Sequence, residues 1–205
     1  MKKSFIFLFV VFTFCMVSSV FGQNDSVQSK KTELVSVDLS YGKSALSSGL
    51  SLAFNLKGQK TFTQITLSQD IIFLNHFYSV PKLKLNIGPS VGYFQNVPFG
   101  GVICKFSPFK FFSTLHWVGY SFGTPNGKMS IEPSFLFLVN SASINVWRLK
   151  GSYSIVNFMG LPAKHVVSVC YQHQIAKNFA VYTDAGYDMT NKEQLLKFGI
   201  IWKQK

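Results

Sequence analysis

The strongest constraint in this 205-residue sequence is a two-residue hydrophobic alternation near its C-terminus. Between residues 179 and 188, mostly apolar odd positions alternate with mostly small or polar even positions. After a polar turn, Leu196, Phe198, Ile200 and Trp202 continue the pattern. A period of two is typical of β-strands, whose successive side chains point to opposite faces. The C-terminal segment is therefore predicted to be a β-hairpin.

The same alternation recurs along the chain and predicts twelve strands. The strands are expected over residues 34–41, 50–56, 61–73, 83–93, 99–106, 111–122, 129–137, 142–149, 152–159, 167–172, 179–188 and 195–202. Residues 75–81 are expected to form one of the longer outer loops, and Thr124–Gly127 a tight turn. The pattern is least clear over residues 140–159, so a count of ten strands stays open.

The composition indicates which face of these strands points outward. Charged residues make up only 14% of the chain, whereas a soluble surface usually carries about 25–35%. The polar face consists mainly of small residues and would cover a water-facing exterior poorly. We therefore predict an all-β fold, an antiparallel transmembrane up-and-down β-barrel with its apolar face outside. A secreted soluble barrel of the lipocalin type, with the faces inverted, is the alternative.

Aromatic side chains near the strand ends support the membrane prediction, because such residues gather where a bilayer meets water. The candidates for this interfacial position are Tyr41, Tyr93, Phe122, Tyr187 and Trp202.

The N-terminus has the features of an export signal. Lys2 and Lys3 precede an apolar run over residues 5–17, which is short for a membrane-spanning helix. We expect a cleaved signal peptide over residues 1–22, a polar leader over 23–32 and a barrel domain over 33–205.

These features together resemble the small outer-membrane β-barrels of Gram-negative bacteria. The resemblance covers residues 33–203 and rests on the signal peptide, the two-residue repeat and the final strand with its aromatic Trp202. It implies residence in the outer membrane and recognition by the barrel-assembly machinery. Such barrels typically end on an aromatic residue, whereas here Lys203, Gln204 and Lys205 follow Trp202. No diagnostic motif carries site residues across.

Charged and polar residues on the predicted inner face are the candidates for function. The lumen-lining candidates are Asp38, Lys57, Asp70, Lys84, Lys105, His116, Glu132, Asp184, Asp188 and Lys197. In an open barrel these side chains would set the ion preference of a narrow passive channel or transport accessory. In a filled barrel they would pair with one another inside a non-conducting structural or interaction protein.

No catalytic or metal-binding motif stands out. A barrel lipid hydrolase using His116 with Asp70 or Glu132 is a weaker alternative, since nothing in the sequence brings them together. Cys104 and Cys170 are predicted on opposite faces, which excludes a disulfide between them. No metal, cofactor or enzymatic activity is predicted.

The charge balance is basic, with 20 Lys and Arg against 8 Asp and Glu. The cations are scattered and almost all are lysine, whereas nucleic-acid recognition favours clustered arginine, so nucleic acid is not an expected partner. Outer-membrane lipid, including lipopolysaccharide phosphates, is an expected partner of the rim lysines, and ordinary solvated loop charge is the alternative. The rim lysines of the predicted outer side are Lys43, Lys82, Lys110, Lys164 and Lys192.

Overall fold

A computed structural model describes residues 32–95, 97–123, 132–158 and 161–204. The predicted signal peptide, nearly all of the predicted leader and the predicted turn at Thr124–Gly127 lie outside the described residues. None of the helices within these ranges is both long enough and apolar enough to cross a membrane.

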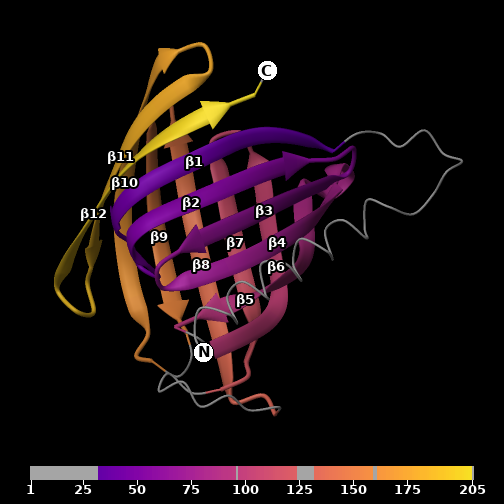
Figure 1. Ribbon diagram of the computed structural model, residues 1–205, viewed down its shortest axis with the longest axis vertical. Coiled ribbons are helices and arrows are strands. Elements are labelled where there is room, and N and C mark those ends of the chain that lie inside the picture. The colour runs from indigo at the N-terminus through magenta and orange to yellow at the C-terminus, as the bar shows by residue number, and fades with distance from the viewer. Residues whose placement is uncertain (1–31, 96, 124–131, 159–160, 205) are drawn as a thin grey trace, which may run out of the picture. The chain divides into compact units, whose positions relative to one another are not determined.

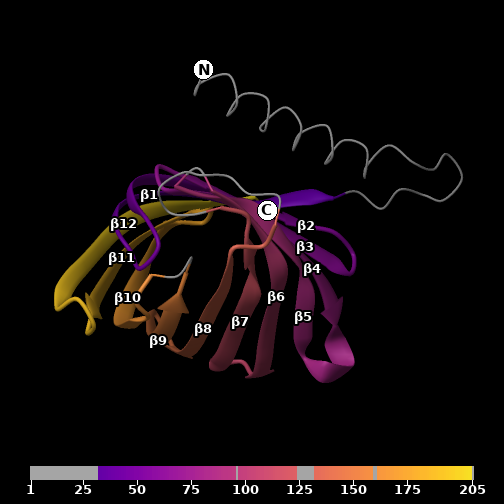
Figure 2. The same ribbon diagram turned by 90° about the horizontal axis from the view of Figure 1, so that it is seen from below.

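Twelve antiparallel strands form one closed barrel, in which each strand pairs with its neighbours in the chain and β12 pairs with β1 (Figure 1). Figure 2 shows the strands following one another around the curve of the wall. The strands are β1 (Glu33–Lys43), β2 (Ser48–Lys57), β3 (Thr61–Ser68), β4 (Ile71–Val80), β5 (Leu85–Phe94), β6 (Val97–Phe109), β7 (Phe112–Ser121), β8 (Phe135–Val146), β9 (Leu149–Asn157), β10 (Lys164–Ala176), β11 (Phe179–Asp188) and β12 (Glu193–Lys203). The predicted all-β barrel fold and its strand count are confirmed.

Two errors in the predicted strand boundaries cancel in that count. The segment predicted as one strand over 61–73 contains a turn at Gln69 and Asp70, so that β4 occupies most of the predicted loop at 75–81. Ser68 stabilises this turn, because its hydroxyl donates to the Ile71 carbonyl at 2.9 Å and accepts from the Ile71 amide at 3.2 Å. The segments predicted over 129–137 and 142–149 instead contribute to one continuous strand, β8.

The barrel has two rims of different character. The rim at which β1 begins and β12 ends, here called the terminal rim, has the connections 58–60, 81–84, 110–111, 147–148 and 177–178. The opposite rim, here called the loop rim, has the connections 44–47, 69–70, 95–96, 122–134, 158–163 and 189–192. Residues 75–81, predicted as an outer loop, therefore end at the terminal rim. This displacement follows from the missed turn at Gln69 and Asp70, which reverses the direction of β5, β6 and β7.

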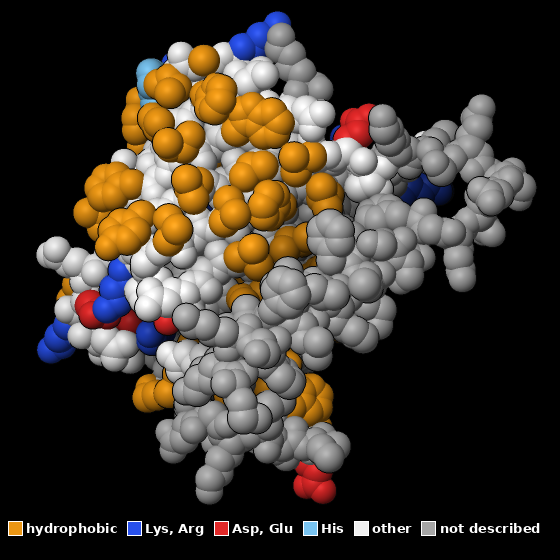
Figure 3. Space-filling view, in the orientation of Figure 1, with side chains coloured by type: hydrophobic (Ala, Val, Ile, Leu, Met, Phe, Trp, Pro, Cys, Tyr) orange, Lys and Arg blue, Asp and Glu red, His pale blue; other side chains and the backbone are white. Residues whose placement is uncertain are grey.

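The outer face of the barrel is apolar. Large hydrophobic side chains project from it along most strands, including Leu39, Val118, Leu138 and Val169, each at least 40% exposed. Figure 3 shows such side chains spread over the strands of one face. The backbone groups of a closed barrel are hydrogen-bonded between strands, and the exterior of this barrel is apolar. This architecture therefore suits a lipid bilayer. The alternative of a soluble lipocalin-like barrel, with the apolar face inside, is wrong for this chain.

Candidate functional site in the barrel lumen

The strand register determines which side chains share the lumen, because residues directly opposite each other in paired strands point to the same face. Lys197 lies opposite Asp184, Asp184 opposite Cys170, and Cys170 opposite Lys150. This row crosses four neighbouring strands, β12 to β9, and brings both signs of charge together. The lumen row includes Cys170, whereas Cys104 faces outward beside Phe106 and Val102, so the two thiols remain free.

Seven of the predicted lumen residues lie on the inner face or at its mouth. They are Asp38, Lys57, Lys84, Lys105, Asp184, Asp188 and Lys197. Lys150, Lys164, Lys203, Glu33 and Glu193 also point inward by register, although the sequence pattern did not single them out. Whether these side chains line an open path stays a prediction.

Three of the predicted lumen residues lie elsewhere. His116 faces outward, opposite Cys104 and Asn140, because its strand neighbour Trp117 is the buried inner residue. Asp70 lies in the β3–β4 turn at the loop rim, where it accepts hydrogen bonds from the Ser48 amide and hydroxyl, both at 2.8 Å. Glu132 precedes β8 in an exposed bend.

The predicted interfacial aromatics lie at the strand ends. Tyr41, Tyr93, Phe122 and Tyr187 are near the loop rim, and Trp202 is near the terminal rim. Tyr41 is 68% exposed, which suits a side chain at a bilayer surface. Their role at such a surface stays a prediction.

The polar part of the lumen is lined by small hydrogen-bonded side chains. Three serine pairs bridge successive strands from β7 to β10 at 2.8–2.9 Å, namely Ser113–Ser143, Ser141–Ser154 and Ser152–Ser168. Across the lumen wall, the Tyr182 hydroxyl donates to both carboxylate oxygens of Asp38, at 3.0 and 3.2 Å. The buried Oδ1 atom of Asp184 has no hydrogen-bond partner within the described part of the chain.

An aromatic cluster fills the lumen near the loop-rim ends of β5 to β9, and the sequence pattern did not predict it. Phe94, Phe99, Trp117, Phe137 and Phe158 are all buried, and their ring centroids lie 4.8–5.7 Å apart in successive contacts. Phe94 belongs to β5, while Phe158 directly follows β9, and their centroids are only 4.9 Å apart. The cluster therefore spans the interior between strands that are far apart around the wall.

Lysines surround a cavity of about 460 Å³ at the terminal rim, here called the mouth cavity. Lys84, Lys105 and Lys110 line it together with Phe109 and Asn145. Lys84 donates from Nζ to the Pro108 carbonyl at 2.6 Å, and it also lies over the Phe109 ring. No acidic side chain lines this cavity, so its electrostatic potential favours anions.

All four histidines lie on the outward face, and each is hydrogen-bonded across to a neighbouring strand or turn. The bonds are His76–Thr63 at 2.7 Å, His116–Asn140 at 2.8 Å, His165–Tyr153 at 2.7 Å and His173–Arg148 at 2.9 Å. None of these partners is a nucleophilic serine or an acid, so the hydrolase pairing of His116 with Asp70 or Glu132 is wrong. Within the described ranges, no group of three or more His, Cys, Asp or Glu side chains is placed to hold a metal ion.

Comparison with known proteins adds little beyond the fold. No protein-family model matches the sequence, and no curated protein matches it. A solved NanC porin has a TM-score of 0.49 at 8% sequence identity, over 83% of this chain and 100% of that chain. A loop L8 deletion mutant of OmpT, an outer membrane protein of Vibrio cholerae, has a TM-score of 0.27 at 8% identity, over 85% and 99% of the two chains. At these values the likeness carries no argument, and the architecture of an outer-membrane β-barrel follows from the closed, outwardly apolar sheet itself.

Proposed function

We propose that this chain is a narrow passive channel of the bacterial outer membrane that favours anions. The observation that carries the proposal is the mouth cavity, where three lysines converge and no carboxylate lines the wall. Charges at the entrance of a pore raise the local concentration of the opposite ion and set its selectivity.

The inner face supports the same preference. Inward lysines outnumber inward acids among the described residues: Lys57, Lys84, Lys105, Lys150, Lys164, Lys197 and Lys203 against Glu33, Asp38, Asp184, Asp188 and Glu193. Glu193 is further neutralised by an ion pair with Lys43 at the loop rim. We expect ions to pass between the mouth cavity, at the terminal-rim ends of β6 to β8, and the polar wall of β9 to β12, β1 and β2, because the aromatic cluster occupies the loop-rim ends of β5 to β9.

The orientation of the barrel in the membrane follows from the lengths of the connections at its two rims. Bacterial barrels keep short turns on the periplasmic side and longer loops outside. The terminal rim has connections of no more than four residues, whereas the loop rim has the long connection between Ser121 and Phe135. The mouth cavity therefore opens to the periplasm.

The reversal potential in a planar bilayer under a salt gradient tests the proposal. The wild-type barrel is expected to favour chloride. The double variant Lys84→Glu with Lys105→Glu should shift the reversal potential toward the value expected for a cation-selective pore. The double variant Lys60→Glu with Lys177→Glu is the matched control, since it makes the same charge change in the β2–β3 and β10–β11 turns, outside the mouth cavity. Equal shifts of the reversal potential in the test variant and in the control variant would contradict the assignment of ion selectivity to the mouth cavity.

The aromatic cluster favours a second candidate, a non-conducting barrel that acts through its surface. Rings meeting between β5 and β9 remove much of the cross-section that a pore would need. This candidate predicts that the correctly folded protein gives no ion conductance in planar bilayers. Heat-dependent gel mobility verifies the folding independently. A conducting wild-type barrel rules it out.

A further inference from the structure

Arg148 is the single arginine of the chain and lies in an unusual setting at the terminal rim. Its guanidinium group lies over the ring of Trp147, 4.6 Å from the ring centroid, and Nη1 is 2.9 Å from Nδ1 of His173. Trp147 is 84% exposed at the tip of the β8–β9 turn. These three residues are here called the rim cluster. No acid forms a salt bridge with Arg148 within the described ranges.

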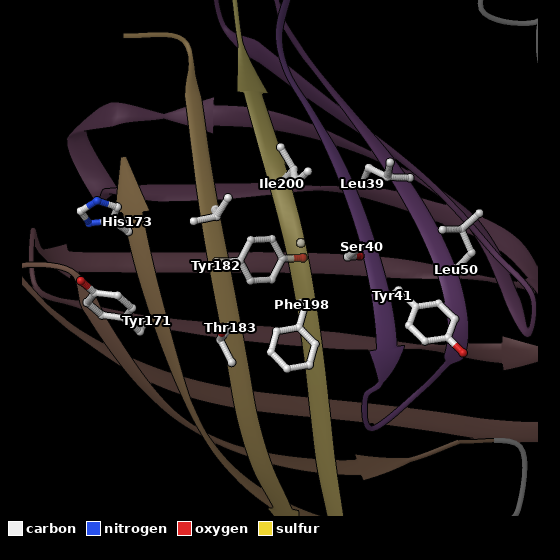
Figure 4. A pocket seen from close by; sticks show the side chains of 12 residues that line it. Leu39, Ser40, Tyr41, Leu50, Tyr171, His173, Tyr182, Thr183, Phe198 and Ile200 are labelled. Carbon is white, nitrogen blue, oxygen red and sulfur yellow. The ribbon is translucent and has the colours of Figure 1, made fainter. Parts of the chain in front are cut away.

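A groove on the outside of the barrel begins at the same histidine. This lateral groove has a volume of about 520 Å³ and crosses strands β10, β11, β12, β1 and β2. Its walls include Tyr171, His173, Phe198, Ile200, Leu39 and Tyr41 (Figure 4). The register places these side chains on the outward face, where the hydrocarbon of a bilayer would lie.

We propose that the rim cluster and the lateral groove together bind one anionic phospholipid. Arg148 holds the phosphate, His173 orients the guanidinium group, and an acyl chain lies in the groove. Arginine suits this role because its planar donors match phosphate oxygens in pairs and its charge persists at every physiological pH. Trp147 at the tip and Tyr171 beside His173 suit the head-group region of a bilayer.

The surrounding charge selects an anionic head group. Lys177 occupies the neighbouring β10–β11 turn, and the only acid at the terminal rim among the described residues, Glu33, lies on β1. Basic residues close to a membrane surface attract anionic lipid. A single bound lipid differs from general adsorption, because it needs both the phosphate contact and the groove.

Native mass spectrometry of the detergent-purified barrel with added phosphatidylglycerol tests this site. One lipid per barrel is expected, and Arg148→Ala should weaken its binding by roughly tenfold or more, as expected for losing a charged hydrogen bond. Arg148→Lys should restore only part of the affinity. Lys60→Ala is the control, because it removes a rim cation that lies outside both the rim cluster and the lateral groove.

A second variant probes the groove without touching the arginine. Ile200→Trp narrows the lateral groove and should weaken binding of phosphatidylglycerol while heat-dependent gel mobility shows a folded barrel. Unchanged lipid binding in Arg148→Ala, or an equal loss in Lys60→Ala, would overturn the proposal. Full competition by soluble glycerol phosphate would also overturn it, since the site would then bind a free phosphate. These measurements do not depend on whether the barrel conducts ions.

Discussion

At the scale of single residues, the interior aromatic side chains are accommodated by glycines directly across the sheet. Phe99 lies opposite Gly92, Phe137 opposite Gly119 and Tyr182 opposite Gly199. A Cβ atom built on each of these glycines would approach the facing ring within 2.4–2.7 Å. Each ring therefore lies flat over a position that lacks a side chain, as in the aromatic coverage of glycine used in designed sheets.

Gly199→Ala is expected to destabilise the barrel, because the new methyl group would displace the Tyr182 ring and its hydrogen bonds to Asp38. Overpacking of this kind typically costs about 1–3 kcal/mol. Urea unfolding in detergent measures the change in the free energy of unfolding. Gly151→Ala serves as the control, since a Cβ atom there would meet nothing within 4 Å. Equal stability of the two variants would contradict the role of Gly199.

At the scale of elements, β8 differs from most strands because both of its faces are apolar near the loop rim. Phe137 is fully buried inside, whereas its neighbours Leu136 and Leu138 project outward and are exposed. A strand covered on both sides is typically a continuous apolar run, and alternation cannot then tell the two faces apart. The rule that the apolar face points outward therefore fails here, because Phe135 and Phe137 point into the lumen.

Substitutions at adjacent positions of β8 should separate the two faces. Phe137→Ala removes a ring from the aromatic cluster and is expected to cost about 3–5 kcal/mol of unfolding free energy, the usual range for a buried phenylalanine. Leu138→Ala should cost clearly less, because its side chain projects out of the sheet. Equilibrium unfolding in the same micelles compares the two directly. A larger loss for Leu138→Ala would show that the faces are assigned the wrong way round.

Whether the inner and outer faces of a strand could be predicted depends on the hydrophobic pattern of that strand. In β1, β2, β5 and β10 to β12 most inner positions are small or polar, with exceptions such as Leu195 and Ile201, so alternation alone assigned their faces correctly. It failed between β3 and β4, where the turn at Gln69 and Asp70 contains neither Gly nor Pro. The residues of the candidate site also divide into those that the alternation predicts and those that it does not. Inward charges were predictable from alternation, whereas the aromatic cluster and the outward histidines depend on contacts between distant strands.

At the scale of the whole molecule, the barrel has a polar interior and an apolar exterior, and the two free thiols report on them. Cys170 faces the polar interior between Asp184 and Lys150, while Cys104 faces outward between Ile87 and His116. The barrel thus contains a natural pair of probes for its interior and its exterior.

Thiol labelling uses this pair. In the folded barrel, a small water-soluble methanethiosulfonate reagent is expected to modify Cys170 in a Cys104→Ala variant much faster than Cys104 in a Cys170→Ala variant, because water reaches the lumen and lipid covers the outside. Mass spectrometry of the intact protein follows the reaction. An unreactive Cys170 in the folded barrel, with normal labelling after unfolding, would indicate a dry interior and contradict the channel.

The unequal rims also have a consequence for how the barrel enters its membrane. The terminal rim carries Lys57, Lys60, Lys82, Lys84, Lys110, Arg148, Lys150, Lys177 and Lys203, against the single acid Glu33 among the described residues. Transfer of so many uncompensated cations through hydrocarbon is prohibitive, whereas the described residues of the loop rim carry acids and cations in nearly equal numbers, Asp70, Glu132, Asp188 and Glu193 against Lys43, Lys164 and Lys192. We therefore expect the chain to enter a bilayer loop rim first, with the cations of the terminal rim staying on the side from which the chain was delivered.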